Sequence, residues 1–290
     1  MKHHDAMSMS ALTWARFRRS RLAMSALLYV AIMSVIALLA PMLAHDGGSL
    51  IPFSPDSVSL GERLEAPSKL HPLGTDDLGR DILSRIIHGA RVSLTVGLLA
   101  TVISLVVGSV LGAIAGYYGG AADWLVSRLI EVVLCFPFLF LVLGIVALFK
   151  PSLATIMIAL GLTSWTNEAR YVRGEFLRVR DLEFAQAARA SGARDARIIF
   201  RHLLPNALAP VLVSASFGVA FAILTESALS FLGLGVPLPT PSWGGILSAA
   251  HDHIEYAWWM ILFPGLAIFL TVAAFNVIGE RVRDALDPRS

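Results

Sequence analysis

Six apolar segments set the fold of this 290-residue chain. Each is long enough to cross a bilayer, which takes roughly 20 apolar residues of helix. They cover residues 23–43, 92–117, 123–148, 153–172, 209–234 and 258–279. Only 15% of the residues are charged, whereas soluble domains carry about a quarter. The sequence therefore predicts an all-α, polytopic membrane protein with six transmembrane helices.

The basic residues place both ends of the chain on one side of the membrane. Lys and Arg are dense in the tail 1–22, the loop 173–208 and the tail 281–290. With six spans, these three regions share a side, and basic segments of this kind stay in the cytoplasm. The first span, 23–43, follows several arginines as a signal peptide would. Its apolar run is longer than a signal peptide needs, so we expect it to be retained.

The first external loop, residues 44–91, has a helical pattern of its own. Thr75 is a suitable N-cap residue, and Leu78, Ile82 and Ile86 recur after it at helical spacing. Charged residues fill the opposite face. We therefore predict an amphipathic helix at the outer membrane surface.

Residues 92–280 then form a core of five spans. Small residues recur at every fourth position of its first span, a pattern that lets helix backbones approach closely. They are Ser104, Gly108, Gly112 and Gly116. The pattern leaves open whether the packing partner lies in this chain or in another. In the next span, Pro137 should cause a kink, because proline removes a backbone donor.

Several kinds of chemistry are missing from the sequence. It contains no P-loop, no H-E-x-x-H, no cysteine cluster and no G-x-S-x-G. The spans lack the series of Asp, Glu and His expected of a proton-coupled carrier. We therefore expect a non-catalytic chain that binds no cofactor or metal and takes its energy from elsewhere. The net charge of +2 gives no indication of a nucleic-acid partner.

The loop 173–208 is the most distinctive polar segment. Residues 182–190 favour a helix, Gly192 marks a turn, and residues 194–204 form a second short amphipathic helix. If the turn needs a positive φ, a β-branched residue at position 192 should misplace both helices. Pro205 should end that second helix before the fifth span. The residues alone fit two roles equally: a docking surface for another protein, or a surface helix held by lipid headgroups.

The spacing within this loop resembles that of the loop by which bacterial ABC importer permeases dock their ATPase. The family pattern is Glu-Ala-Ala, three residues, Gly, nine residues, Ile, one residue, Leu-Pro. This chain keeps every spacing with Gln186-Ala187-Ala188, Gly192, His202 and Leu204-Pro205. Gln186 replaces the family's Glu and His202 replaces its Ile. A hydrogen bond from Gln186, or a charge contact from Glu183, can stand in for the missing salt bridge.

Four further segments resemble the C-type subunit of the dipeptide/oligopeptide branch of these permeases. They are residues 74–81 (GTDDLGRD), 229–235 (LSFLGLG), 241–244 (PSWG) and 283–288 (RDALDP). With the loop they span nearly the whole chain in order. The resemblance implies a type I importer fold in a bacterial inner membrane and peptides as the cargo.

The resemblance also implies partners. These are a second homologous permease, two ATPase subunits and an extracytoplasmic binding protein that delivers the solute. The permease lies in the lipid bilayer and hydrolyses no ATP itself. The residues implied in coupling to the ATPase are Glu183, Gln186, Ala187, Ala188, Gly192, Arg194, Arg197, Arg201, His202, Leu204 and Pro205.

Two polar residues within the spans are candidates for the translocation path. A charge at Glu226 is costly in a bilayer, so it either lines the path or joins helices by hydrogen bonds. Asn276 presents the same two choices. By contrast, Arg128 and Glu131 are spaced for an ion pair. The histidines around Asp252 are too few for a convincing metal site.

The sequence leaves two alternatives to peptide import. The same branch includes importers of nickel, glutathione and other small solutes. A membrane scaffold that uses the loop only to recruit a cytoplasmic partner belongs to a different class. Activity stimulated by a binding protein distinguishes an importer from a scaffold.

Overall fold

The computed structural model describes residues 9–48 and 51–286, which contain helices and no strand. The predicted all-α fold is therefore confirmed. The helices are α1 (Met9–Arg19), α2 (Arg21–Leu43), α3 (Ile82–Tyr118), α4 (Gly120–Leu134), α5 (Phe138–Leu148), α6 (Leu153–Val179), α7 (Glu183–Ala190), α8 (Asp195–Arg197), α9 (Leu204–Phe231), α10 (Trp243–Ala250) and α11 (Trp259–Leu286).

The predicted spans all lie on these helices. Within the described residues, four helices are long and apolar enough to cross a membrane: α2, α3, α9 and α11. The pair α4 and α5 makes a fifth span if it is counted as one. The remaining predicted span, 153–172, lies within α6, which has 27 residues. Polar residues in the C-terminal half of α6 explain why its mean hydropathy is lower.

The expected kink at Pro137 is a sharp break. Helix α4 ends at Leu134, α5 begins at Phe138, and their axes differ by 86°. Pro137 occupies the N-cap position of α5, where its missing N–H leaves no helical carbonyl without a partner.

The stripe of small residues packs within the subunit, against α6. A Cβ atom added at Gly108 would lie 2.5 Å from the Cβ of Glu168, and one added at Gly116 would lie 2.5 Å from the Cβ of Phe176. Between them, Gly112 abuts the carbonyl oxygen of Ala169. Helices α3 and α6 therefore touch backbone to backbone, which fixes α6 firmly to the longest helix of the bundle.

The external loop differs from its prediction. Helix α3 begins at Ile82 and runs without a break into the membrane span, and its N-cap is Asp81, whose side chain accepts a hydrogen bond from the Ser84 N–H. Thr75 instead forms an isolated antiparallel β-bridge with Asp81, and its hydroxyl group donates to the carbonyl of Glu62. The prediction of a Thr75 cap is wrong because the Asp81 carboxylate is the stronger acceptor at the point where the helical pattern starts.

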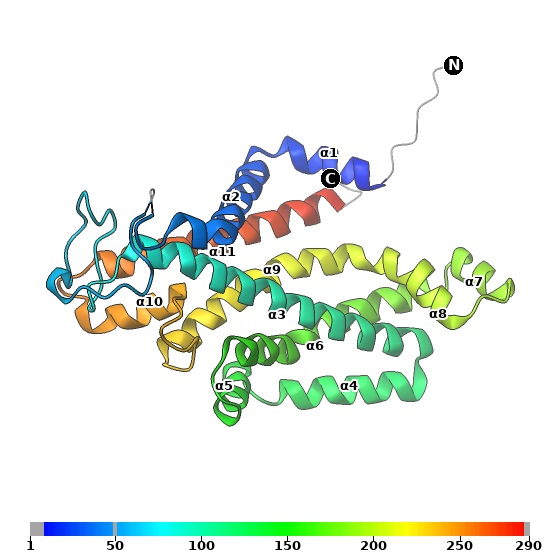
Figure 1. Ribbon diagram of the computed structural model, residues 1–290. Coiled ribbons are helices and arrows are strands. Elements are labelled where there is room, and N and C mark those ends of the chain that lie inside the picture. The colour runs from blue at the N-terminus through cyan, green and yellow to red at the C-terminus, as the bar shows by residue number, and fades with distance from the viewer. Residues whose placement is uncertain (1–8, 49–50, 287–290) are drawn as a thin grey trace, which may run out of the picture.

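Two ends of the bundle can be followed in Figure 1. Helices α7 and α8 lie at one end, and α10 lies at the other with the segment that precedes α3. Helix α1 packs against the last turns of α11 through Phe17 and Ala285. We call the end that holds α7 and α8 the loop end, and the opposite end the α10 end.

Candidate functional site

The segment between α6 and α9 folds as predicted into a helix, a glycine turn and a second short helix. Gly192 has a φ of +75°. The Gly192 N–H donates to the carbonyl of Arg189 at 2.9 Å, and the Ala193 N–H donates to that of Ala188 at 3.1 Å. This pair of bonds is the Schellman arrangement, which ends a helix with a left-handed residue. The turn at Gly192 therefore meets the condition of a positive φ.

The second helix does not end at Pro205. Helix α8 passes into a single π-helical stretch, Ile198–Leu203, and from there directly into α9. The Leu204 N–H donates to the Ile199 carbonyl, five residues back. Pro205 lies in the first turn of α9, where proline fits because its N–H is not needed. The expectation that Pro205 stops the helix is therefore wrong, and residues 195–203 are a continuous helical extension of α9.

The predicted coupling residues are brought together on this segment. Most are exposed: Glu183, Gln186, Ala187, Gly192, Arg194, Arg197, Arg201 and Pro205. Ala188, His202 and Leu204 are half-buried. Apolar side chains stand among them, because Leu182, Phe184 and Phe200 are also exposed. The segment therefore presents a mixed surface of arginines and large apolar side chains, which is typical of protein interfaces.

Gln186 has a role inside the loop. Its Nε2 atom donates a 2.9 Å hydrogen bond to the carbonyl oxygen of Asp181, just before α7. A glutamate could not make this bond, because its carboxylate has no donor when ionised. Glu183, one turn earlier, leaves its charge in solvent.

Apolar packing fixes the loop to the bundle. Ala185, Ile198 and Leu203 are buried in one cluster with Val172 and Phe176 of α6. The loop therefore has an apolar underside that is joined to the core and an outer face that is free in the described chain.

Polar contacts add a second attachment, to the end of α3. The Tyr117 Oη donates to Asp195 Oδ1 at 2.7 Å, and the guanidinium carbon of Arg189 lies 5.3 Å from the centre of the Tyr117 ring. Arg180 Nη1 donates to the carbonyl of Gly116 at 3.0 Å. Sequence analysis did not single out these partners. The sequence feature that could have indicated them is the position of Tyr117 at the end of an apolar span.

The two path candidates have different surroundings. Glu226 is 0% exposed and accepts hydrogen bonds from Ser230 Oγ at 2.8 Å and Ser93 Oγ at 3.3 Å. The same Ser93 oxygen accepts from the Trp243 N–H at 3.3 Å. Glu226 therefore ties α9 to α3 and to the start of α10. Asn276 is half-buried on α11.

The other polar predictions are also located. Arg128 and Glu131 form the expected ion pair. Near Asp252, the Nδ1 atom of His253 lies 2.8 Å from Tyr256 Oη. No group of three His, Cys, Asp or Glu side chains that could hold a metal ion occurs in the described chain.

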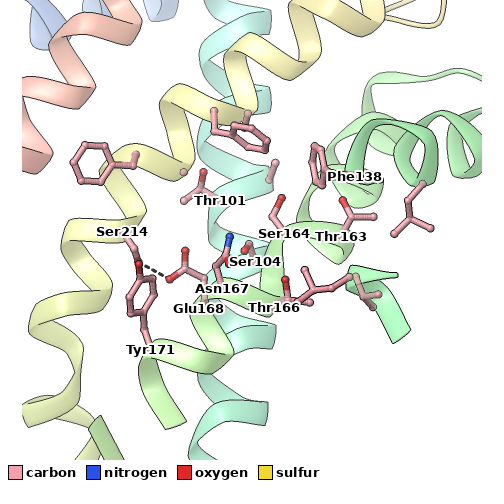
Figure 2. A pocket seen from close by; sticks show the side chains of 18 of the residues that line it. Thr101, Ser104, Phe138, Thr163, Ser164, Thr166, Asn167, Glu168, Tyr171 and Ser214 are labelled. Carbon is pink, nitrogen blue, oxygen red and sulfur yellow. Dashed lines mark hydrogen bonds between the residues drawn. The ribbon is translucent and has the colours of Figure 1, made fainter. Parts of the chain in front are cut away.

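A pocket of about 500 Å³ opens between α3, α6, α9 and the broken pair α4–α5. Its polar lining includes Ser104, Ser164, Asn167, Glu168 and Ser214. Figure 2 shows Glu168 of α6 facing Ser214 of α9, with Ser104 of α3 close by. Sequence analysis did not single out Glu168. The sequence feature that could have indicated Glu168 is an acidic residue in a polar run inside a predicted span.

Comparisons with known proteins agree with this architecture. A family model described as "Binding-protein-dependent transport system inner membrane component" matches residues 108–290. Another, described as "N-terminal TM domain of oligopeptide transport permease C", matches residues 8–67.

Two curated relatives match over most of their length. The dipeptide transport system permease protein DppC of Alkalihalophilus pseudofirmus is 42% identical, over 94% of this chain and 88% of the relative. The glutathione transport system permease protein GsiD of Pectobacterium atrosepticum is 40% identical, over 95% of this chain and 90% of the relative.

A solved structure supports the fold. A chain of the inward-facing MetNI methionine ABC transporter aligns with a TM-score of 0.55 at 20% identity, covering 69% of this chain and 95% of that one. Together these matches show that the chain belongs to the family of binding-protein-dependent transport system inner membrane components and is an ABC importer permease of the bacterial inner membrane.

Proposed function

We propose that this permease imports di- and oligopeptides, forms half of the translocation path, and receives the movement of ATPase subunits through its loop. The observation that carries the proposal is the form of the segment from α7 to the π-helical stretch. It has an exposed face of arginines and apolar side chains, and a buried face joined to α6. Residues 173–179 and 204–208 of the predicted loop 173–208 belong to α6 and α9, so we refer to residues 181–203 from here on as the coupling loop.

The mechanical part of the proposal follows from the connections of this loop. It leaves α6 after Val179 and continues directly into α9 at Leu204. Nucleotide binding would close two separate ATPase subunits, and each would carry the docked loop with it. Because the loop is packed on α6 and extends α9, both helices would tilt and change access to the path from one side of the membrane to the other.

The full assembly would contain this chain, a second homologous permease, two ATPase subunits and an extracytoplasmic binding protein. The ATPase subunits would dock at the loop end, and the binding protein would release its solute at the α10 end. This orientation agrees with the basic residues of the tail that precedes α2 and of the coupling loop.

Peptide cargo is supported by the relative that is named for dipeptides, and glutathione by the relative that is named for glutathione. Both compounds carry a free α-amino group and peptide bonds. The α-ammonium group is therefore one of the features that the two possible cargoes share.

Reconstitution of the assembly in proteoliposomes tests the proposal. We expect the binding protein, loaded with a dipeptide, to stimulate ATP hydrolysis and uptake of that peptide. An intact complex that hydrolyses ATP at the same rate with and without loaded binding protein, and accumulates no peptide, would contradict import and favour a scaffold.

A further inference from the structure

The pocket beside Glu168 has a polar side and an apolar side. Phe138 of α5 and Phe217 and Phe221 of α9 form its aromatic wall. Its volume of about 500 Å³ is within the range of roughly 300–1,000 Å³ that small-molecule sites occupy. It lies between the two helices that flank the coupling loop, so its shape would change as that loop moves.

Glu168 is the chemical feature of this pocket. The residue is only 7% exposed, and its Oε2 accepts a 2.5 Å hydrogen bond from Ser214 Oγ. It forms no ion pair with any other residue in the described ranges. An ionised carboxylate can accept about four hydrogen bonds, so one serine leaves most of its capacity unused.

Two of the other hydroxyl groups around the pocket do not compete for this carboxylate. The hydroxyl of Thr101 donates to the carbonyl of Gly97 at 2.7 Å, and that of Thr163 donates to the carbonyl of Ala159 at 2.7 Å. Both protons are thus used within their own helices. Among the described residues that line the pocket, there is no Lys, Arg or His to act as a cationic donor.

The contrast with Glu226 strengthens this point. Glu226 is inaccessible and has serine donors on both carboxylate oxygens, so its hydrogen bonds join helices. Glu168 faces a cavity with one donor. Acidic residues inside membrane proteins that face a cavity mark pathways for substrates or ions.

We propose that the Glu168 pocket binds the α-ammonium group of the cargo during its passage, with the aromatic wall receiving the adjoining side chain. This inference rests on the proposed function, because it takes peptides as the cargo. An ammonium group supplies three N–H donors, which the free acceptor capacity of Glu168 can receive. The carboxylate would thus select for cargo with a free amino terminus.

Cysteine accessibility in the full complex, held in lipid nanodiscs without the binding protein, tests the proposal. The exposed Cys135 is first replaced by serine. Ser164→Cys then places a thiol in the pocket, and Val58→Cys places one on the exposed segment before α3. Two methanethiosulfonate reagents of similar size, one aminoethyl and one sulfonatoethyl, report the preference for charge.

At each position we compare the rate of the cationic reagent with that of the anionic one. We expect this ratio of rates to be about tenfold or more higher at Ser164→Cys than at Val58→Cys. Adding Glu168→Gln should bring the ratio of rates at Ser164→Cys within roughly twofold of that at Val58→Cys. Adding Glu168→Asp instead should keep the preference for the cationic reagent. Dialanine should slow the modification at Ser164→Cys, and N-acetyl-dialanine should not.

Three outcomes would overturn the inference. Equal rates for the two reagents would show that the pocket does not attract cations. Equal protection by dialanine and its acetylated form would show that the ammonium group is not what binds. A thiol that reacts only after the second permease is removed would show that the partner subunit fills the pocket. Each of these can occur in a complex that still imports peptides, so the proposed function would stand.

Discussion

The Tyr117 hydroxyl group and the Asp195 carboxylate, 78 residues apart in sequence, form a 2.7 Å hydrogen bond that joins the last turn of α3 to the first turn of α8. Because α3 packs backbone to backbone on α6, this bond links the coupling loop to a closely packed pair of helices. Loop movement and helix movement should therefore be coupled through it.

Tyr117→Phe removes the hydroxyl group and its bond to Asp195, while the ring that faces Arg189 remains. A bond to a charged acceptor contributes about 1.5–3 kcal/mol, so we expect less peptide to be imported per ATP hydrolysed while the complex still assembles. The measurement is the ratio of uptake to hydrolysis in proteoliposomes. Tyr118→Phe, at the neighbouring exposed tyrosine, is the matched control, and equal ratios in the two variants would contradict a coupling role.

Gly192→Val should weaken the docking of the ATPase subunits while the spans still insert. Its φ of +75° strains a β-branched residue by about 1–3 kcal/mol, although a Cβ atom there would meet no neighbour. The yield of ATPase subunits that co-purify with the permease measures the effect.

Gly192→Asn is the control, because asparagine tolerates the left-handed region. We expect it to retain co-purification. If the valine variant docks as well as the asparagine variant, the turn geometry is not required.

Gly112→Val should separate α3 from α6. The added side chain would meet the backbone of Ala169 and the Cβ of Val172, and overpacking of this kind destabilises by about 1–3 kcal/mol. Thermal stability of the detergent-solubilised protein, read as loss of the monodisperse peak on heating, reports the change. Gly144→Val provides the comparison, since a Cβ atom at Gly144 meets nothing within 4 Å.

Asp81→Ala should loosen the α10 end. The Asp81 carboxylate accepts from the Ser84 N–H at 2.7 Å and lies 3.0 Å from the Nδ1 atom of buried His71. Loss of an N-cap alone costs about 0.5–2 kcal/mol. We expect faster proteolysis of the segment before α3, with Asp252→Ala, an exposed site, remaining at the wild-type rate.

The sequence was sufficient for features that depend on local chemistry. Apolar length predicted the spans, Gly192 predicted the turn, and the spacing of Arg128 and Glu131 predicted their ion pair. It failed where two strong local signals competed, as at Thr75 and Asp81, or where a proline fitted the first turn of a helix, as at Pro205.

Contacts between distant segments could not be predicted from the sequence. The hydrogen bond from Tyr117 to Asp195, the packing of Gly112 on Ala169 and the exposure of Glu168 to a pocket all depend on the placement of α6 beside α3. The stripe of small residues indicated a close contact without identifying its partner helix. Only a three-dimensional arrangement distinguishes the enclosed Glu226 from Glu168.

Disulfide crosslinking between the coupling loop and an ATPase subunit tests the central proposal most directly. Ala187→Cys, in a Cys135→Ser background, would be paired with single cysteines along the surface groove of the co-expressed ATPase, with Val58→Cys as the control at the α10 end. We predict a crosslink at Ala187→Cys whose yield changes when ATP is added, and none at Val58→Cys. Absence of any crosslink at Ala187→Cys in a complex that still imports its cargo would contradict the account.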